Sequence, residues 1–83
     1  MTIQVFNLSL NITDTDLTRL FAAYGVVHSA EVSRNVYTGR SKGNGLVQMP
    51  INAEALQAIA SLDKSMLDGK KISVSEFQLP PHW

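Results

Sequence analysis

The stretch KGNGLVQM, residues 42–49, combines a cation with two glycines and carries no aromatic ring. Lys42 could neutralise a phosphate group, and Gly43 and Gly45 would let a strand backbone approach a nucleic-acid chain closely. Proteins that hold single-stranded nucleic acid usually also stack its bases on aromatic side chains. From these residues alone, the stretch is compatible with an RNA-binding strand, with the remnant of one, or with a strand that never bound RNA.

The preceding stretch, RNVYTGRSK at residues 34–42, mixes basic side chains with one aromatic ring. Arg34, Arg40 and Lys42 could hold phosphates, and Tyr37 could stack on a base. The same residues would also suit an ordinary solvated hairpin loop. Phosphate contact and a loop exposed only to solvent both remain open from the sequence.

The balance of charge argues against tight binding of a polyanion. The 83 residues contain Lys+Arg 7 and Asp+Glu 7, so the formal net charge is zero, whereas phosphate contacts supply most non-specific affinity for nucleic acid. Most of the positive charge nevertheless lies in two short stretches, residues 34–42 and residues 70–71. Lys71 is predicted to point from the last strand toward an open sheet face.

The sequence carries no signal for catalysis, metal binding or membrane insertion. The lack of cysteine excludes disulfides and thiolate metal sites, and His28 has no neighbour that completes a site. Because no phosphate-binding glycine-rich loop or paired-carboxylate motif is present, we expect neither an enzyme nor a bound cofactor. The N-terminus does not resemble a signal peptide, and no segment has the roughly 20 apolar residues that span a membrane. We expect a cytoplasmic protein with no membrane partner.

Periodic patterns in the first third of the chain predict a strand and a helix. Residues 3–8 alternate as a half-buried strand, which puts Gln4 and Phe6 on the face opposite Ile3 and Val5. Thr13 and Asp16 are spaced as in a capping box at the start of a helix. The apolar face of that helix is expected to hold Leu17, Leu20, Phe21 and Tyr24. Gly25 is expected to end it in a left-handed cap.

The rest of the chain predicts three more strands and a second helix. Strands are expected at residues 27–32, 43–49 and 71–77. Pro50 stops the middle one of these, and Asp68-Gly69 forms a turn before the last. The helix is expected at residues 52–62, with an inward face made of Ala55, Leu56, Ile59 and Leu62.

The resulting element order is βαββαβ. An antiparallel sheet with one apolar face requires both helices on that face and leaves the other open to solvent. The predicted fold class is therefore α+β, a ferredoxin-like βαββαβ sandwich in one domain over residues 1–77. Residues 78–83 are expected to form a C-terminal tail, in which Trp83 could cover the sheet, stack on a base or fray.

Several stretches together resemble the RNA-recognition motif family, most closely its short single-domain bacterial members. They occur in family order and at family spacing over residues 2–77, and they read IQVFNL, LTRLFAAYGVV, TGRSKG, KGNGLVQM and LDGKKISV. The resemblance implies a four-stranded antiparallel sheet of order 4-1-3-2 whose open face binds single-stranded RNA through aromatic rings.

The resemblance also shows which stacking rings are replaced. The long family motif K/R-G-F/Y-G/A-F-V-x-F/Y is matched at Lys42, Gly43, Gly45 and Val47. Asn44 and Leu46 stand where the two solvent-facing rings are usual, and Gln4 replaces the ring of the short motif on the first strand. Met49 replaces a ring that would point into the core. Phe6 could offer a displaced stacking ring, or it could pack against the tail or another subunit.

Two functions follow as alternatives. The first is an RNA-binding module that binds single-stranded RNA weakly on the open sheet face and the basic loop. Its candidate nucleic-acid-binding residues are Gln4, Phe6, Arg34, Tyr37, Arg40, Lys42, Asn44, Leu46 and Lys71. The second is a protein-interaction or self-association module, such as a homodimer through the sheet face, that has lost RNA binding there. Salt separates them, because phosphate contacts weaken steeply as ionic strength rises.

Overall fold

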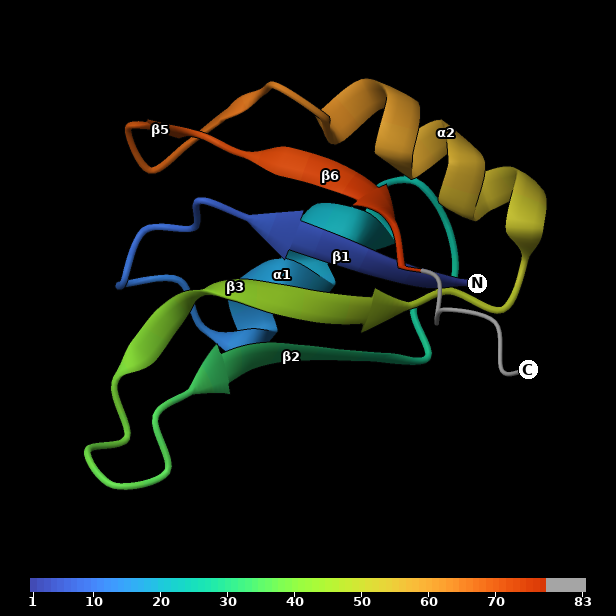
Figure 1. Ribbon diagram of the computed structural model, residues 1–83. Helices are drawn as coiled ribbons and strands as arrows, with labels where there is room; N and C mark the ends of the chain where they lie inside the picture. Colours follow the sequence, from blue (N-terminus) through green and yellow to red (C-terminus); the bar gives the residue numbers. More distant parts are fainter. Residues whose placement is uncertain (78–83) are drawn as a thin grey trace, which may run out of the picture.

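The computed structural model describes residues 1–77, in which two helices cover one face of an antiparallel sheet (Figure 1). In chain order the elements are β1 (Thr2–Phe6), α1 (Asp14–Ala22), β2 (Ser29–Arg34), β3 (Ser41–Gln48), α2 (Asn52–Leu62), β4 (Met66–Leu67), β5 (Lys70–Lys71) and β6 (Ser73–Glu76). The main sheet has the order β2-β3-β1-β6. Because β6 corresponds to the fourth predicted strand, this is the expected order 4-1-3-2 read from the opposite edge. The predicted ferredoxin-like α+β fold is therefore confirmed.

The central strand β1 sets the two faces of the sheet. Ile3 and Val5 are fully buried under the helices, and Gln4 and Phe6 alternate with them on the other side. The predicted orientation of the first strand is therefore confirmed. The strand ends at Phe6, two residues earlier than expected, because Asn7 adopts the left-handed conformation with φ 63°.

The N-terminus of α1 carries the expected capping box. The Thr13 hydroxyl accepts a hydrogen bond from the Asp16 N–H at 3.2 Å, and the Asp16 carboxylate accepts one from the Thr13 N–H at 3.0 Å. The helix buries Leu17 and Phe21, as predicted. Two of the backbone groups that every helix start leaves unpaired are thereby satisfied.

The expected left-handed cap at Gly25 is wrong. The helix ends at Ala22, and its cap residue Ala23 keeps a right-handed conformation with φ −64°. Gly25 has φ 159°, far from the left-handed helical region. A Cβ at Gly25 would collide with the side chain of Glu54, whose Oε1 accepts a hydrogen bond from the Val26 N–H at 2.9 Å. The absence of a side chain at Gly25 thus makes room for the contact between the segment that follows α1 and Glu54 of α2.

The inward face of α2 differs from the expected one at one position. Ala55, Ala58 and Leu62 are buried, and Ile59 packs partly buried against the core. Leu56, which was expected to face inward, is 54% exposed. The apolar periodicity of this helix admits two overlapping faces, and the small alanines face the sheet because they let the helix approach it closely.

The expected continuous strand over residues 71–77 is also wrong. Lys71 belongs to a separate hairpin in which β5 pairs with β4, and β6 begins only at Ser73. The buried Ile72 separates the two strands. Its N–H donates to the Ser65 carbonyl at 2.9 Å, and its own carbonyl accepts from the Lys64 N–H at 2.8 Å. These two hydrogen bonds hold residue 72 outside the main sheet, just before β6 begins. The predicted turn at residues 68–69 is present.

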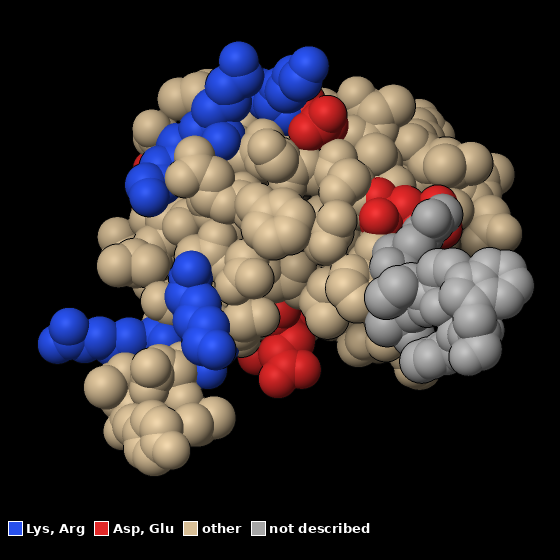
Figure 2. Space-filling view, viewed as in Figure 1, with Lys and Arg blue, Asp and Glu red and all other residues tan. Residues whose placement is uncertain are grey.

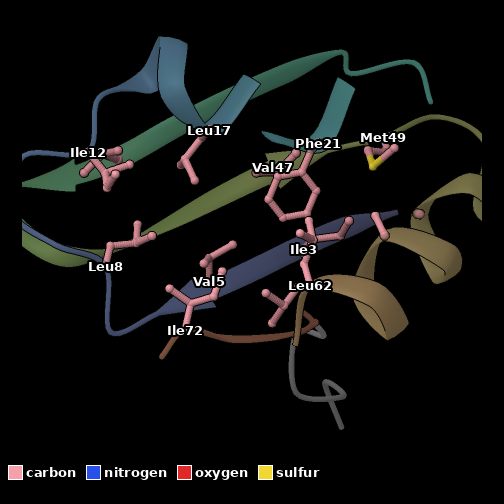
Figure 3. Close-up of a cluster of buried hydrophobic side chains, with 14 residues drawn as sticks. Ile3, Val5, Leu8, Ile12, Leu17, Phe21, Val47, Met49, Leu62 and Ile72 are labelled. Carbon is pink, nitrogen blue, oxygen red and sulfur yellow. The ribbon is translucent and has the colours of Figure 1, made fainter. Parts of the chain in front are cut away.

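Side chains from both helices and the strands meet in one core between the layers (Figure 3). The ring of Phe21 lies between Val47 of β3 and Ile3 of β1 in that view. Met49 is fully buried, as the resemblance implied. The missing side chain of Gly45 would point into this core as well, so the glycine makes room for helix packing. A Cβ there would lie 2.8 Å from the Glu31 carbonyl oxygen and 2.9 Å from Leu17 Cδ1.

Gly45→Ala should therefore destabilise the protein. The added methyl group forces either β2 or α1 to shift, and overpacking of this kind costs about 1–3 kcal/mol of unfolding free energy. Urea unfolding followed by circular dichroism measures the change. Gly39→Asn serves as the control, because space around Gly39 is open and Asn tolerates its φ of 73°. A loss at Gly45 no larger than in the control would contradict the close packing of β3 on α1.

Asp16 should make the stability of α1 depend on pH in the acid range. Its pKa lies below the ordinary value of 3.8, chiefly because the Thr13 N–H donates to the carboxylate and further because of the Thr13 side chain and the charge of Arg19. A carboxyl with a lowered folded-state pKa stabilises the fold above its unfolded pKa. That contribution is lost as pH falls through the folded value.

Asp16→Asn should thus have a lower free energy of unfolding than the parent protein near neutral pH. This gap in unfolding free energy should close as the pH falls below the folded-state pKa of Asp16. Urea unfolding at a series of pH values measures it. A Thr13→Ala background should narrow the gap, because the hydroxyl half of the capping box is gone. A gap that stays constant across the titration would show that the carboxylate charge does not stabilise the helix.

Candidate nucleic-acid interface

The face of the sheet turned away from the helices is open, and the strand register arranges its side chains in rows. In one row Gln4 of β1 lies between Leu46 of β3 and Ser75 of β6, and its Nε2 donates to Ser75 Oγ at 3.0 Å. In the next row Phe6 lies between Asn44 and Ser73. The predicted open-face positions of Gln4, Phe6, Asn44 and Leu46 are therefore confirmed, and Ser73 and Ser75 share that face.

The open face carries two apolar side chains near its centre. Phe6 is 42% exposed and Leu46 is 40% exposed. The two are diagonal neighbours on adjacent strands, since Phe6 is paired with Asn44 and Gln4 with Leu46. They form a small apolar patch with one exposed aromatic ring.

A hollow of about 460 Å³ lies beside Phe6, where β1 ends and β3 begins. Its walls are Phe6, Asn7, Leu8, Lys42, Gly43 and Asn44. The Leu8 N–H donates to the Gly43 carbonyl at 2.8 Å, so the chain after β1 is tied to the start of β3. Gly43 adopts φ 81°, which a residue with a side chain rarely does. This motif glycine therefore serves the backbone geometry of the hollow.

Asn44 has an unusual environment in this row. Its Oδ1 is buried and has no hydrogen-bond partner among residues 1–77. A buried acceptor without a partner costs about 1–3 kcal/mol. The side chain thus keeps an unused hydrogen-bonding group at the wall of the hollow, and a strand pattern read from the sequence gives no sign of it.

The basic loop between β2 and β3 is closed by its own hydrogen bonds. Asn35 Oδ1 accepts from the backbone N–H groups of Tyr37 at 2.8 Å and Thr38 at 3.1 Å, and the Asn35 N–H donates to the Arg40 carbonyl at 2.8 Å. Arg34 Nη1 approaches the Gly39 carbonyl at 3.5 Å. Tyr37 projects from the loop and is 93% exposed. The loop is therefore structured and presents an exposed ring.

Lysine and arginine side chains form two separate groups in the space-filling view (Figure 2). One group lies along the top and upper left, over the β4–β5 hairpin, and the other lies at the lower left, near the β2–β3 loop. Both lie toward the end at which β1 stops and β3 starts (Figure 1). Lys71 stands in β5 beside it, and its carbonyl accepts from Asn7 Nδ2 at 2.8 Å. The centre of the face is uncharged, while Glu31 of β2 lies opposite Leu46.

The structure brings most of the predicted site residues together. Phe6, Asn44 and Lys42 line the hollow, Gln4 and Leu46 lie in the adjacent row, and the remaining basic residues flank that end. Tyr37 lies apart, at the loop. Sequence reasoning missed Asn7 and Leu8, because their part in the hollow depends on contacts across the sheet.

Other candidate features of the sequence do not add to this site. His28 is exposed, and its backbone N–H donates to the Gln48 carbonyl at 2.7 Å. Within residues 1–77, no three His, Asp or Glu side chains are grouped so as to hold a metal ion. Neither helix of that region is long and apolar enough to cross a membrane. The expectations for residues 78–83, including Trp83, fall outside the described residues.

Comparison with known proteins gives one consistent family. The family model described as the RNA recognition motif matches residues 3–73. Glycine-rich RNA-binding protein 1 of Mycosarcoma maydis is 42% identical over 73 residues, which are 88% of this chain and 42% of that protein. RbpA of Synechocystis sp. is 37% identical over 76 residues, which are 92% of this chain and 75% of that protein. The chain therefore spans less than half of the first relative and three quarters of the second.

A solved structure is similar over almost the whole chain. The crystal structure of RNA binding protein PG1 superposes with a TM-score of 0.92 at 39% sequence identity, covering 99% of both chains. The strand order, the paired motif strands and the family model therefore agree, and this chain belongs to the RNA recognition motif family.

Proposed function

We propose that this domain binds single-stranded RNA weakly, with a base on Phe6 and phosphates along the basic end of the open face. The observation that carries the proposal is that an exposed ring and two separate basic stretches lie toward one end of the sheet. A ring flanked by cations suits a nucleotide chain, since bases stack on the ring while phosphates contact the cations. Relatives named as RNA-binding proteins support the same function.

The expected affinity is low because three usual stacking positions hold Gln4, Asn44 and Leu46. Each base–aromatic stack is worth about 1–3 kcal/mol, so a face with one ring loses several kcal/mol relative to a full platform. Glu31 on the same face repels phosphates. The RNA backbone is therefore expected to run past Lys42 and Arg40, away from the middle of β2.

Salt dependence tests the role of the basic loop. The double variant Arg40→Ala/Lys42→Ala should weaken binding to every short RNA alike. The slope of log K against log salt concentration should become shallower by up to about two. Fluorescence anisotropy with a labelled oligonucleotide at several salt concentrations measures both. Arg19→Ala removes a cation from α1, behind the sheet, and should leave the slope unchanged. Unaltered affinity and slope in the double variant would remove the loop from the mechanism.

Replacement of the ring tests the stacking site. Phe6→Ala should weaken RNA binding by about 5- to 100-fold, as expected for the loss of one stack, while the protein remains folded. The half-exposed ring should cost less than about 2 kcal/mol of unfolding free energy, compared with about 3–5 kcal/mol for the fully buried Phe21→Ala. Sedimentation of the same variant measures its apparent mass, and so its oligomeric state. Unchanged RNA affinity together with a lower apparent mass would contradict base stacking on Phe6.

A further inference from the structure

Asn44 is the residue of the open face whose chemistry the proposed function leaves unused. Its Oδ1 is buried without a hydrogen-bond partner among residues 1–77. The residue also lines the hollow at the start of β3. Because it is paired directly with Phe6 across the strands, the amide and the ring share one row of the sheet.

We propose that Asn44 reads the edge of an adenine base that stacks on Phe6, an assignment that rests on the proposed RNA binding. The last torsion of an Asn side chain is broad, so the amide can turn Oδ1 out of its buried position toward the hollow. There the oxygen accepts from the adenine amino group, and the amide nitrogen donates to the adjacent ring nitrogen. Asn and adenine form this two-bond pair in many nucleic-acid complexes.

The geometry of the row suits such a pair. Directly paired residues of an antiparallel sheet have Cβ atoms about 4.5–5.5 Å apart. A purine that lies over the Phe6 ring therefore extends its edge above Asn44. Lys42 lines the same hollow and can contact a phosphate of the same nucleotide chain.

The two other amides near the ring each have their nitrogen engaged within the protein. Gln4 Nε2 donates to Ser75 Oγ at 3.0 Å, and Asn7 Nδ2 donates to the Lys71 carbonyl at 2.8 Å, so neither nitrogen is free to complete a two-bond pair with a base. Asn44 gains a hydrogen bond when a base donates to it, because its oxygen has none in the free protein. A base that carries an amino donor is favoured for this reason, and uracil, which lacks that group, is disfavoured.

The test compares a short oligoadenylate with an oligomer of the same length built from purine riboside, which lacks only the 6-amino group. The parent protein should bind oligoadenylate about 5- to 100-fold more tightly. Asn44→Ala should abolish this preference, because it lowers the affinity for oligoadenylate, which loses two hydrogen bonds, more than the affinity for the purine riboside oligomer, which loses only the bond to the ring nitrogen. Gln48→Ala is the matched control, since it removes an exposed amide from the same strand and face, in the row of Thr2, and should keep the preference.

The stability of the variant separates recognition from a structural role. Asn44→Ala should unfold at the same urea concentration as the parent or at a higher one, because it removes an unpaired buried acceptor. If it fails to fold, Asn44→Val, with a residue that is favoured in strands and has no hydrogen-bonding group, repeats the comparison.

Three results would overturn the assignment. The parent protein could bind both purine oligomers equally, it could bind oligouridylate as tightly as oligoadenylate, or Asn44→Ala could keep the preference. Each of these leaves RNA binding itself intact. Failure of the parent protein to bind any of the three oligomers would instead overturn the proposed function, and the assignment of Asn44 with it.

Discussion

The contact between Leu17 of α1 and Gly45 of β3 determines which way the functional strand faces. Gly45 lies between Val5 of β1 and Val32 of β2, and a side chain there would collide with the helix and the neighbouring strand. Side chains alternate along a strand, so this inward glycine turns Asn44 and Leu46 outward. A register shift of one residue would bury those two positions and expose the core face.

The acidic and basic side chains have different roles, which explains how a chain of zero net charge can present a basic end. Four of the seven acidic side chains accept hydrogen bonds from backbone N–H groups: Asp14 from Val32, Asp16 from Thr13, Glu54 from Val26 and Asp63 from Val74. They hold helix starts and connections in place. The basic side chains of residues 34–42 and 70–71 instead lie in two groups toward the end of the sheet where β1 stops.

The family scaffold is kept here while its usual stacking positions are replaced. Gln4 and Leu46 still face each other across β1 and β3, which is where two rings would stack bases in relatives with the full motif. The one exposed ring of the strand pair lies a row closer to the basic end, beside the hollow. Under the proposed function, a base on Phe6 would lie one row closer to the basic side chains, which fits weak binding through fewer contacts.

Local patterns in the sequence were sufficient for the element order, the two faces of β1, the capping box of α1 and the outward positions of β3. Each of these depends on residues a few positions apart, whose spacing repeats with the period of a strand or a helix. The same reasoning mispredicted Leu56, Gly25 and the strand through Lys71. At Gly25 and in the segment around Lys71 a contact with a distant segment outweighed the local pattern, and at Leu56 the apolar periodicity of the helix admitted two overlapping faces.

The candidate site likewise combines features that the sequence predicts with features that only the tertiary structure decides. Alternation alone put Gln4 and Phe6 on the open face, and composition alone identified the basic loop. Only the tertiary structure brought residues 34–42 and 70–71 to the same end of the sheet, turned Gly45 toward Leu17, and left Asn44 Oδ1 without a partner. These features depend on strand pairing and helix packing between residues far apart in the chain, which no local periodicity encodes.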